Sequence, residues 1–168
     1  MIKLVQRSLL LACLAGLVFL AACAAPPLLL GQTEGDAIAR FGLPTARYAL
    51  PAGATRLEFA RGPFGRETWM VDLDPAGHVT AIQQVLNEAN FARFQAHAPG
   101  MTRGELLRTL GSPGERRGGG WQGGEVWSWR YPTNDCLWFQ VSIGDDGIVR
   151  DGAYGVDPSC DAPSDPRS

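Results

Sequence analysis

Two stretches of the sequence, Gly31-Gln-Thr-Glu-Gly-Asp-Ala-Ile-Ala-Arg-Phe-Gly-Leu-Pro44 and Gly100-Met-Thr-Arg-Gly-Glu-Leu-Leu-Arg-Thr-Leu-Gly-Ser-Pro113, repeat each other at a spacing of 69 residues. In both stretches Gly, Thr, Gly, an acid, two apolar residues, Gly and Pro recur in step. A repeat of this length predicts that the chain contains two copies of one structural unit.

Each stretch predicts a short capped helix. Thr33 and Thr102 are the expected N-caps; Glu105 completes a capping box in the second copy, and the shorter Asp36 makes a poorer one in the first. The helices are expected to end at glycines in a left-handed conformation, which are Gly42 and Gly111.

The repeat continues downstream at a spacing of 70 residues, in segments whose apolar residues alternate. Leu57 and Phe59 match Trp127 and Trp129; Trp69, Val71 and Leu73 match Phe139, Val141 and Ile143; Gly77 and Val79 match Gly147 and Val149. Alternation with a period of two predicts half-buried strands, and residues 74–77 and 144–147 predict hairpin turns.

One element is expected in the second copy alone. Residues 87–96 predict an additional helix with Phe91 and Phe94 on one face, and Leu28–Leu30 are expected to pack in its place in the first copy. The predicted fold is therefore α+β: two tandem units, each with one or two short helices packed on a three-stranded antiparallel sheet. The two units lie side by side or share one continuous sheet.

Composition and charge narrow the class of partner. The chain has 168 residues, 45% of them hydrophobic, and a formal net charge of −2. This apolar content argues against global disorder, and a chain without basic excess is not expected to bind nucleic acid.

The N-terminus predicts export and lipid attachment. Lys3 and Arg7 precede an apolar run from Leu9 to Ala22, which is too short to cross a bilayer comfortably. Residues Leu20-Ala21-Ala22-Cys23 resemble a bacterial lipobox, in which the cysteine thiol takes a diacylglyceryl group and the chain is cut before it. Two or three acyl chains, such as palmitate, anchor a protein stably. The alternatives are an ordinary secretory signal and an uncleaved membrane helix that runs to Ala25.

These features divide the chain into five parts. They are a lipoprotein signal peptide over 1–22, a lipidated linker over 23–30, a first unit over 31–86, a second unit over 87–155 and a disordered tail over 156–168. Because residue 24 is Ala and not Asp, resemblance to lipoprotein sorting rules implies the periplasmic face of the outer membrane.

The segment Asn87-Glu-Ala-Asn-Phe91, together with residues 100–113, resembles the signature of the SmpA/OmlA (BamE-like) family of outer-membrane lipoproteins. The resemblance covers residues 87–153, with a degenerate second copy over 31–86, and the lipobox agrees with it. It implies a non-enzymatic role beside the outer-membrane β-barrel assembly machinery. Members of the family typically have one unit, and the tandem arrangement is similar to the β-lactamase inhibitor protein fold.

Two cysteines remain after Cys13 leaves with the signal and Cys23 is lipidated. In an oxidising periplasm Cys136 and Cys160 are expected to form a disulfide that pins the tail to the last sheet. The alternative is a reactive thiol at Cys136.

Three patterns suggest chemistry and are better explained as structure. Gly118, Gly120 and Gly123 fit G-x-G-x-x-G but follow a helix and precede a strand, so they predict a loop. The sequence from Asp72 to Gly77 begins like a calcium loop and lacks the later ligands, so it predicts a turn. The histidines, His78 and His97, are too few for a zinc site and are expected in solvent. The sequence therefore predicts no cofactor and no metal site.

The outward side chains of the strands are the predicted binding surface. They are Arg56, Glu58, Thr68, Met70 and Asp72 in the first unit, and Ser128, Arg130, Trp138, Gln140 and Ser142 in the second. Trp138 and Arg130 have no apolar counterpart in the first copy, which makes them candidate partner-binding residues together with Gln140 and Trp121. The alternative is that Trp138 lies buried against the tail.

The expected function is that of a lipid-anchored periplasmic protein-binding module without enzymatic activity, in envelope or outer-membrane protein assembly. Two rivals remain: an inhibitor-like module that caps an envelope enzyme, and a periplasmic hydrolase of cell wall or lipid. A deep pocket with perturbed acids or a His–acid pair favours the hydrolase.

Overall fold

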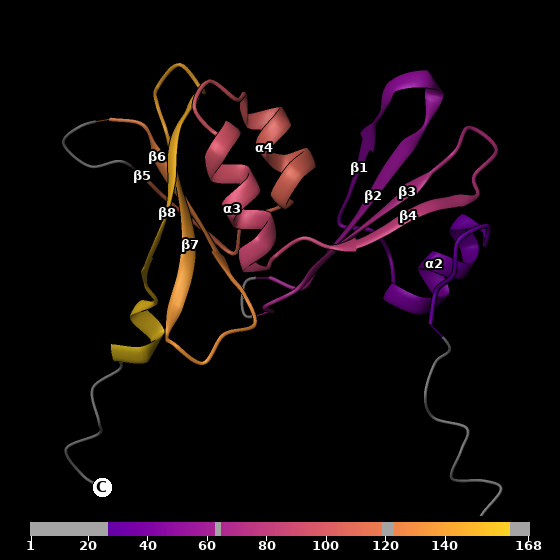
Figure 1. The fold of residues 1–168 in the computed structure, drawn as a ribbon, viewed down its shortest axis with the longest axis horizontal. Helices are drawn as coiled ribbons and strands as arrows, with labels where there is room; N and C mark the ends of the chain where they lie inside the picture. Colours follow the sequence, from indigo (N-terminus) through magenta and orange to yellow (C-terminus); the bar gives the residue numbers. More distant parts are fainter. Residues whose placement is uncertain (1–26, 63–64, 119–122, 162–168) are drawn as a thin grey trace, which may run out of the picture.

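The computed structural model describes residues 27–62, 65–118 and 123–161, and within them the chain forms two four-stranded antiparallel sheets and three α-helices (Figure 1). The first unit contains α2 (Glu34–Phe41), β1 (Ala46–Ala49), β2 (Thr55–Ala60), β3 (Thr68–Leu73) and β4 (Val79–Gln84). The second contains α3 (Glu88–His97), α4 (Arg103–Leu110), β5 (Glu115–Gly118), β6 (Glu125–Arg130), β7 (Leu137–Ile143) and β8 (Val149–Val156). Two 3-10 turns, η2 (Pro51–Gly53) and η4 (Pro158–Asp161), complete the described elements.

The elements form four layers. Figure 1 shows α2, then the sheet β1–β4, then α3 with α4, and finally the sheet β5–β8. Each sheet is a simple meander in which consecutive strands are neighbours. The two sheets are separate, so the alternative of one continuous sheet is wrong.

The predicted repeat is confirmed at the level of single backbone hydrogen bonds. The N–H of Glu34 donates to Gly77 O at 3.1 Å, and its counterpart Arg103 donates to Gly147 O at 3.2 Å. Both sheets also carry a register shift at the same place, between Asp72 and Leu73 in the first and between Ser142 and Ile143 in the second. The backbone framework is therefore the same in both copies.

Both predicted capping boxes are present. Thr33 and Asp36 form both reciprocal hydrogen bonds, as Thr102 and Glu105 do, so the shorter Asp36 side chain makes a capping box as complete as that of Glu105. The C-caps Gly42 and Gly111 have φ of 86° and 79° as expected, but their ψ angles of −168° and −171° place them outside the left-handed helical region. That part of the prediction is wrong, although the positive φ still favours glycine.

The sheets have four strands and not the predicted three. The additional strands β1 and β5 pair with β2 and β6 over four residues each. Glu-Arg-Arg-Gly in β5 has no apolar alternation, and Ala-Arg-Tyr-Ala in β1 has only Ala46 and Tyr48, which is too short a pattern to identify an edge strand. Pairing with a neighbouring strand, and not burial, defines them.

Two apolar clusters hold the layers together. The smaller joins α2 to the inner face of β1–β4 through residues such as Leu57, Phe59 and Val71. The larger joins α3 and α4 to β5–β8, where Phe91 stacks on Phe139 with ring centres 4.2 Å apart. Trp127 and Trp129 face the helices as predicted and are 3% and 1% exposed.

The predicted open face of the first sheet is covered. Arg56 donates to the carbonyl of Arg108 in α4 at 2.8 Å, and the backbone N–H of Ser112 donates to Glu58 at 2.9 Å. Met70 belongs to the larger apolar cluster, and Glu58 and Thr68 are fully buried. The first sheet is thus packed on both faces, because α4 of the second unit lies against it.

The first unit has no described counterpart of α3, and the two copies differ at the strand position that lies under α3. Gly152 of β8 is at this position, where a Cβ atom would meet Phe94 Cε1 at 3.0 Å and Phe139 Cζ at 2.9 Å. Its counterpart in β4 is Ile82, which packs on the smaller apolar cluster. Of the predicted substitutes, Leu28 packs in the core, whereas Leu29 and Leu30 are 59% and 67% exposed.

Candidate functional site

The outer face of the second sheet is the surface that no helix covers in Figure 1. We define it by the side chains of β6 and β7 that alternate with the core: Val126, Ser128, Arg130, Trp138, Gln140 and Ser142. Its counterpart in the first sheet packs against α4. One end of this outer face is closed by the tail, and the other end is hollow.

Trp138 is buried at the closed end, with 2% of its surface exposed, so the prediction of an exposed tryptophan is wrong and the alternative of a buried one is confirmed. The guanidinium carbons of Arg117 and Arg130 lie 5.2 and 5.3 Å from the centre of its ring. Cation–π contacts at these distances favour a fixed ring position. Trp138 therefore forms the floor of the outer face, and the two arginines stand above it.

Arg130 is held by the tail. Its Nε and Nη2 donate to the two carboxylate oxygens of Asp157 at 2.5 and 2.8 Å, and the two side chains are 15% and 5% exposed. This hydrogen-bonded pair, with a further backbone bond from Ser159, lowers the pKa of Asp157 to about 2. The predicted contact of Arg130 with a carboxylate is thus made within the chain.

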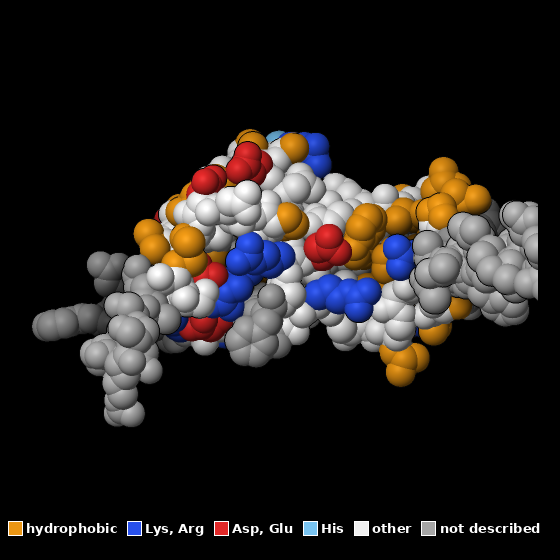
Figure 2. All heavy atoms as spheres, turned by 90° about the horizontal axis from the view of Figure 1, so that it is seen from below, with side chains coloured by type: hydrophobic (Ala, Val, Ile, Leu, Met, Phe, Trp, Pro, Cys, Tyr) orange, Lys and Arg blue, Asp and Glu red, His pale blue; other side chains and the backbone are white. Residues whose placement is uncertain are grey.

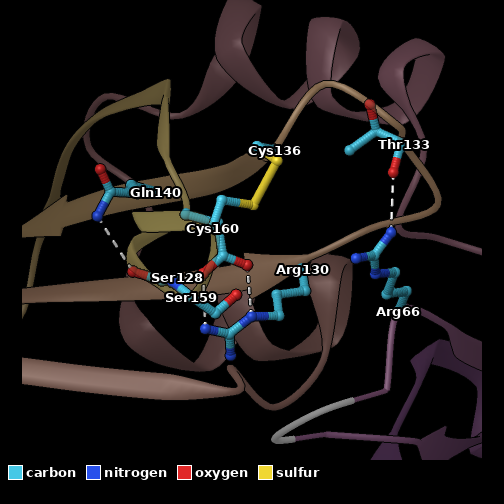
Figure 3. Close-up of polar contacts among 9 residues, drawn as sticks. Arg66, Ser128, Arg130, Thr133, Cys136, Gln140, Ser159 and Cys160 are labelled. Atoms are coloured by element: carbon cyan, nitrogen blue, oxygen red, sulfur yellow. Dashed lines mark hydrogen bonds and ion pairs between the residues drawn. A yellow bond between two sulfur atoms is a disulfide. The ribbon is translucent and has the colours of Figure 1, made fainter. Parts of the chain in front are cut away.

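The disulfide between Cys136 and Cys160 is present, with Cα atoms 5.9 Å apart, as predicted (Figure 3). It fastens η4 beside the Arg130 pair, and the N–H of Asp157 also donates to Cys136 O at 2.8 Å. Residues 158–161, which were predicted to be disordered, therefore form an ordered turn. Two crosslinks, one covalent and one ionic, keep the tail on the closed end.

Gln140 lies in the middle of the outer face and is half-buried. Its amide donates to the Ser128 hydroxyl at 3.2 Å, a bond that Figure 3 also shows. Trp121, the fourth predicted partner-binding residue, lies outside the described residues. A docking role for all four residues remains a prediction.

The hollow end carries a cavity of about 580 Å³ that sequence reasoning did not find. Residues from the start of β6, the end of β7, the β7–β8 turn and the start of β8 line it; they include Val126, Ser142, Glu125, Asp145, Asp146 and Asp151. Four carboxylates face one arginine, Arg150, in this lining. The cavity is therefore negatively charged, in contrast to the arginines at the closed end.

One carboxyl group of the cavity has a lowered pKa. The backbone N–H of Ile148 and the side chain of Arg150 lower the pKa of Asp146, which favours its charged form. Both histidines are exposed as predicted, and His78 lies 3.7 Å from Asp74 on a surface turn of the first unit. Within the described ranges no group of three His, Cys, Asp or Glu side chains is arranged to hold a metal ion.

Among the described residues, no helix is both long enough and apolar enough to cross a bilayer. Figure 2 shows hydrophobic side chains gathered toward the right end of the face in view. Leu29 and Leu30, near the start of the described residues, are exposed. Cys23 and the signal-like segment lie outside the described residues.

Comparisons with known proteins leave the function open. No family model matches the chain, and no curated protein matches it. Among solved structures, a DUF4309 family protein from Bacillus subtilis is 15% identical, with a TM-score of 0.28 over 73% of this chain and 76% of its own. A cysteine-rich secretory protein from Staphylococcus aureus is 10% identical, with a TM-score of 0.29 over 77% of this chain and 44% of its own. Similarity at this level carries no conclusion about fold or function.

Proposed function

We propose that the chain is an outer-membrane lipoprotein of the SmpA/OmlA type that holds a protein partner on the outer face of its second sheet. The tether is Cys23 with its acyl chains, and the process is envelope or outer-membrane protein assembly. No step of chemistry on a substrate is part of this function.

One observation carries the proposal: the same face of the first sheet is already a protein-docking surface within this molecule. Its residues Arg56, Glu58 and Met70 contact α4 and the loop after it. The second sheet repeats this face with the same strand register, and no described helix covers it. Repeat units commonly bury their faces against a neighbour, so this face is suited to a separate partner.

The layer order suits a tethered binding module. Four residues lie between Cys23 and Leu28, so the five steps along the chain place Leu28 within about 17 Å of the membrane surface when Cys23 is anchored. The outer face of the second sheet belongs to the last of the four layers, on the opposite side of the molecule from α2 (Figure 1). A partner in the periplasm reaches this face without meeting the bilayer.

Two experiments test the proposal. Cys23→Ser should release the processed chain from membrane fractions, and unchanged membrane association of an unprocessed chain would contradict lipid anchoring. A photo-crosslinking amino acid at Gln140 or Ser142 should capture one defined envelope protein, while the same probe at Thr80 on exposed β4 serves as the control. Equal capture from both positions is incompatible with docking on the outer face.

A further inference from the structure

One cross-strand row of the outer face differs sharply between the two sheets. In the first sheet the row is Tyr48, Arg56, Asp72 and Ala81. In the second sheet the same row is Arg117, Val126, Ser142 and Asp151. The arginine of the first copy is thus replaced by a shorter apolar residue in the second.

In the first sheet this row holds a guanidinium. Arg56 donates from Nε and Nη2 to the two carboxylate oxygens of Asp72 at 2.6 and 2.8 Å, and from Nη1 to Arg108 O at 2.8 Å. The Arg56 side chain is 25% exposed. A planar guanidinium suits such a two-oxygen contact better than an ammonium group does.

In the second sheet the same place is the cavity at the hollow end. Val126, the counterpart of Arg56, lines it together with Ser142, the counterpart of Asp72. Four positions around it have gained carboxylates relative to the first copy: Thr55 is replaced by Glu125, Pro75 by Asp145, Ala76 by Asp146 and Ala81 by Asp151. Two carboxylates are lost there, because Ser142 replaces Asp72 and Gly144 replaces Asp74, so the surroundings gain two carboxylates overall. The row also gains Arg117 in place of Tyr48, but Arg117 bonds Glu115 and lies over the Trp138 ring. The place that the Arg56 guanidinium fills in the first copy is thus open in the second copy, and its surroundings are more negative.

The cations nearby neutralise only part of this charge. Arg103 bonds Glu125 at 2.9 Å, and Arg150 bonds Asp146 at 2.8 Å. Asp145 accepts a backbone N–H from Gly124 at 2.6 Å, and neither it nor Asp151 forms an ion pair with any described residue. A positively charged group is the complement that this cavity lacks.

We propose that this cavity binds an arginine side chain presented by the protein partner, in the place that Arg56 occupies in the first unit. The inference deepens the proposed function, because it names the chemistry by which the outer face selects its partner. The guanidinium donates to the carboxylates of Asp145 and Asp151, and its stem lies along Val126. A partner segment with an arginine over the hollow end therefore docks where α4 docks on the first sheet.

The test uses the full chain in a mild detergent and two small probes, N-acetylarginine amide and its neutral isostere N-acetylcitrulline amide. Amide NMR signals of Gly123, Gly144 and Asp151 should shift saturably with the arginine probe. The citrulline probe should bind at least about tenfold more weakly, because it lacks the charge that the carboxylates recognise. Equal binding of both probes, or shifts spread over unrelated surfaces, would overturn the inference.

Two variants separate the site from general charge effects. Val126→Arg supplies the guanidinium from within the chain, as Arg56 does, and should abolish the probe-induced shifts. Asp151→Asn should weaken the arginine probe about tenfold, while Asp135→Asn, an exposed residue before β7 and outside the cavity, should leave its binding unchanged. If Val126→Arg fails to fold, the Asp151 variant alone decides. These measurements need no partner, so a failure here with successful crosslinking at Gln140 rejects the arginine site and keeps the docking face.

Discussion

The two units share one backbone and differ in what covers the outer faces of their sheets. On the first sheet the centre of that face carries Glu58 and Thr68, and α4 packs directly on them. On the second sheet the counterparts are Ser128 and Trp138, and both side chains are buried. The small Thr68 thus stands where Gly111 at the end of α4 approaches, whereas the large Trp138 stands at the matching place on a face that no described helix covers. The comparison indicates that the second unit seals part of its face with its own side chains.

The largest effect expected from this comparison is at Trp138. Because the side chain is buried, Trp138→Ala should lower the free energy of unfolding by about 4 kcal/mol. Thr68→Ala, the matched change in the first sheet, should cost about 1 kcal/mol, because little volume is lost. Denaturant unfolding of both variants measures the difference. A small effect of Trp138→Ala would mean that the ring is not part of the packed structure.

The next effect concerns the contact between the units. Glu58 is fully buried and accepts hydrogen bonds from Ser112 N at 2.9 Å, from the Thr45 hydroxyl at 3.0 Å and from the Tyr48 hydroxyl. Burial and the hydrogen bond to Glu58 raise the pKa of Tyr48. Glu58→Ala leaves these donors unsatisfied and should cost about 3 kcal/mol.

Ser128→Ala is the matched control in the second sheet and should cost about 1 kcal/mol, because one neutral hydrogen bond to Gln140 is lost. Comparable losses in the two variants would show that Glu58 does not fasten α4 to the first sheet. Chemical denaturation at pH 7 measures both variants.

Local patterns in the sequence predicted most of the framework and little of its assembly. The caps at Thr33 and Thr102, the two turns and the inward aromatics are confirmed, because each depends on residues close in the chain or on strand periodicity. The contact of α4 with Arg56 and Glu58 was missed, because alternation identifies a second face without showing which distant element covers it. The short strands β1 and β5 were missed for the related reason that an edge strand needs no apolar period.

The candidate site also has one part that the sequence predicted and one part that it did not. The disulfide followed from compartment and cysteine count, and the structure contains it. The cavity depends on a difference between the two copies, Val126 for Arg56, and on carboxylates that come from three separate segments. An alignment of the repeat could have found the lost arginine, but the fold was needed to place Asp145 and Asp151 around it.

A third prediction uses a pair of matched residues, Asn87 and Asp157, that lie after the last strand of each unit. Asn87 caps α3 after β4, and its counterpart Asp157 accepts the Ser159 N–H at 3.0 Å and also binds Arg130. Because the pKa of Asp157 in the folded state is about 2, below that of an unfolded aspartate, its pair stabilises the fold above pH 4. This stability, about 2 kcal/mol, is lost as the pH falls through 2.

Asp157→Asn introduces the residue of the first copy and keeps the oxygen that accepts the Ser159 N–H. It should reduce stability at pH 7 and remove this step from the acid limb of the stability curve. Thermal unfolding between pH 2 and pH 7 measures the effect. An unchanged pH profile would show that Arg130 does not stabilise the ionised form.

The smallest expected effect concerns the two capping boxes. Their hydrogen bonds have nearly the same lengths, but their helices have different surroundings, and the variants test whether the bonds contribute equally to stability. In both capping boxes the threonine N–H donates to the acid at 2.8 Å, and the return bonds from Asp36 N and Glu105 N are 3.3 and 3.2 Å. Thr33→Ala and Thr102→Ala should therefore each cost about 1 kcal/mol of local helix stability. Their surroundings differ, because α2 is the outermost layer and α4 lies between the two sheets (Figure 1).

An outer helix can open alone, whereas a helix between two sheets opens only when the contacts on both sides break. Thr33→Ala should accordingly speed amide hydrogen exchange in α2 by about fivefold and leave β5–β8 unchanged. Thr102→Ala should speed exchange across α4 and both sheets by the same factor, because there the local loss becomes a loss of global stability. If exchange in α4 alone responds, the two units are not joined into one cooperative structure, and the docking of α4 on the first sheet is weaker than its hydrogen bonds indicate.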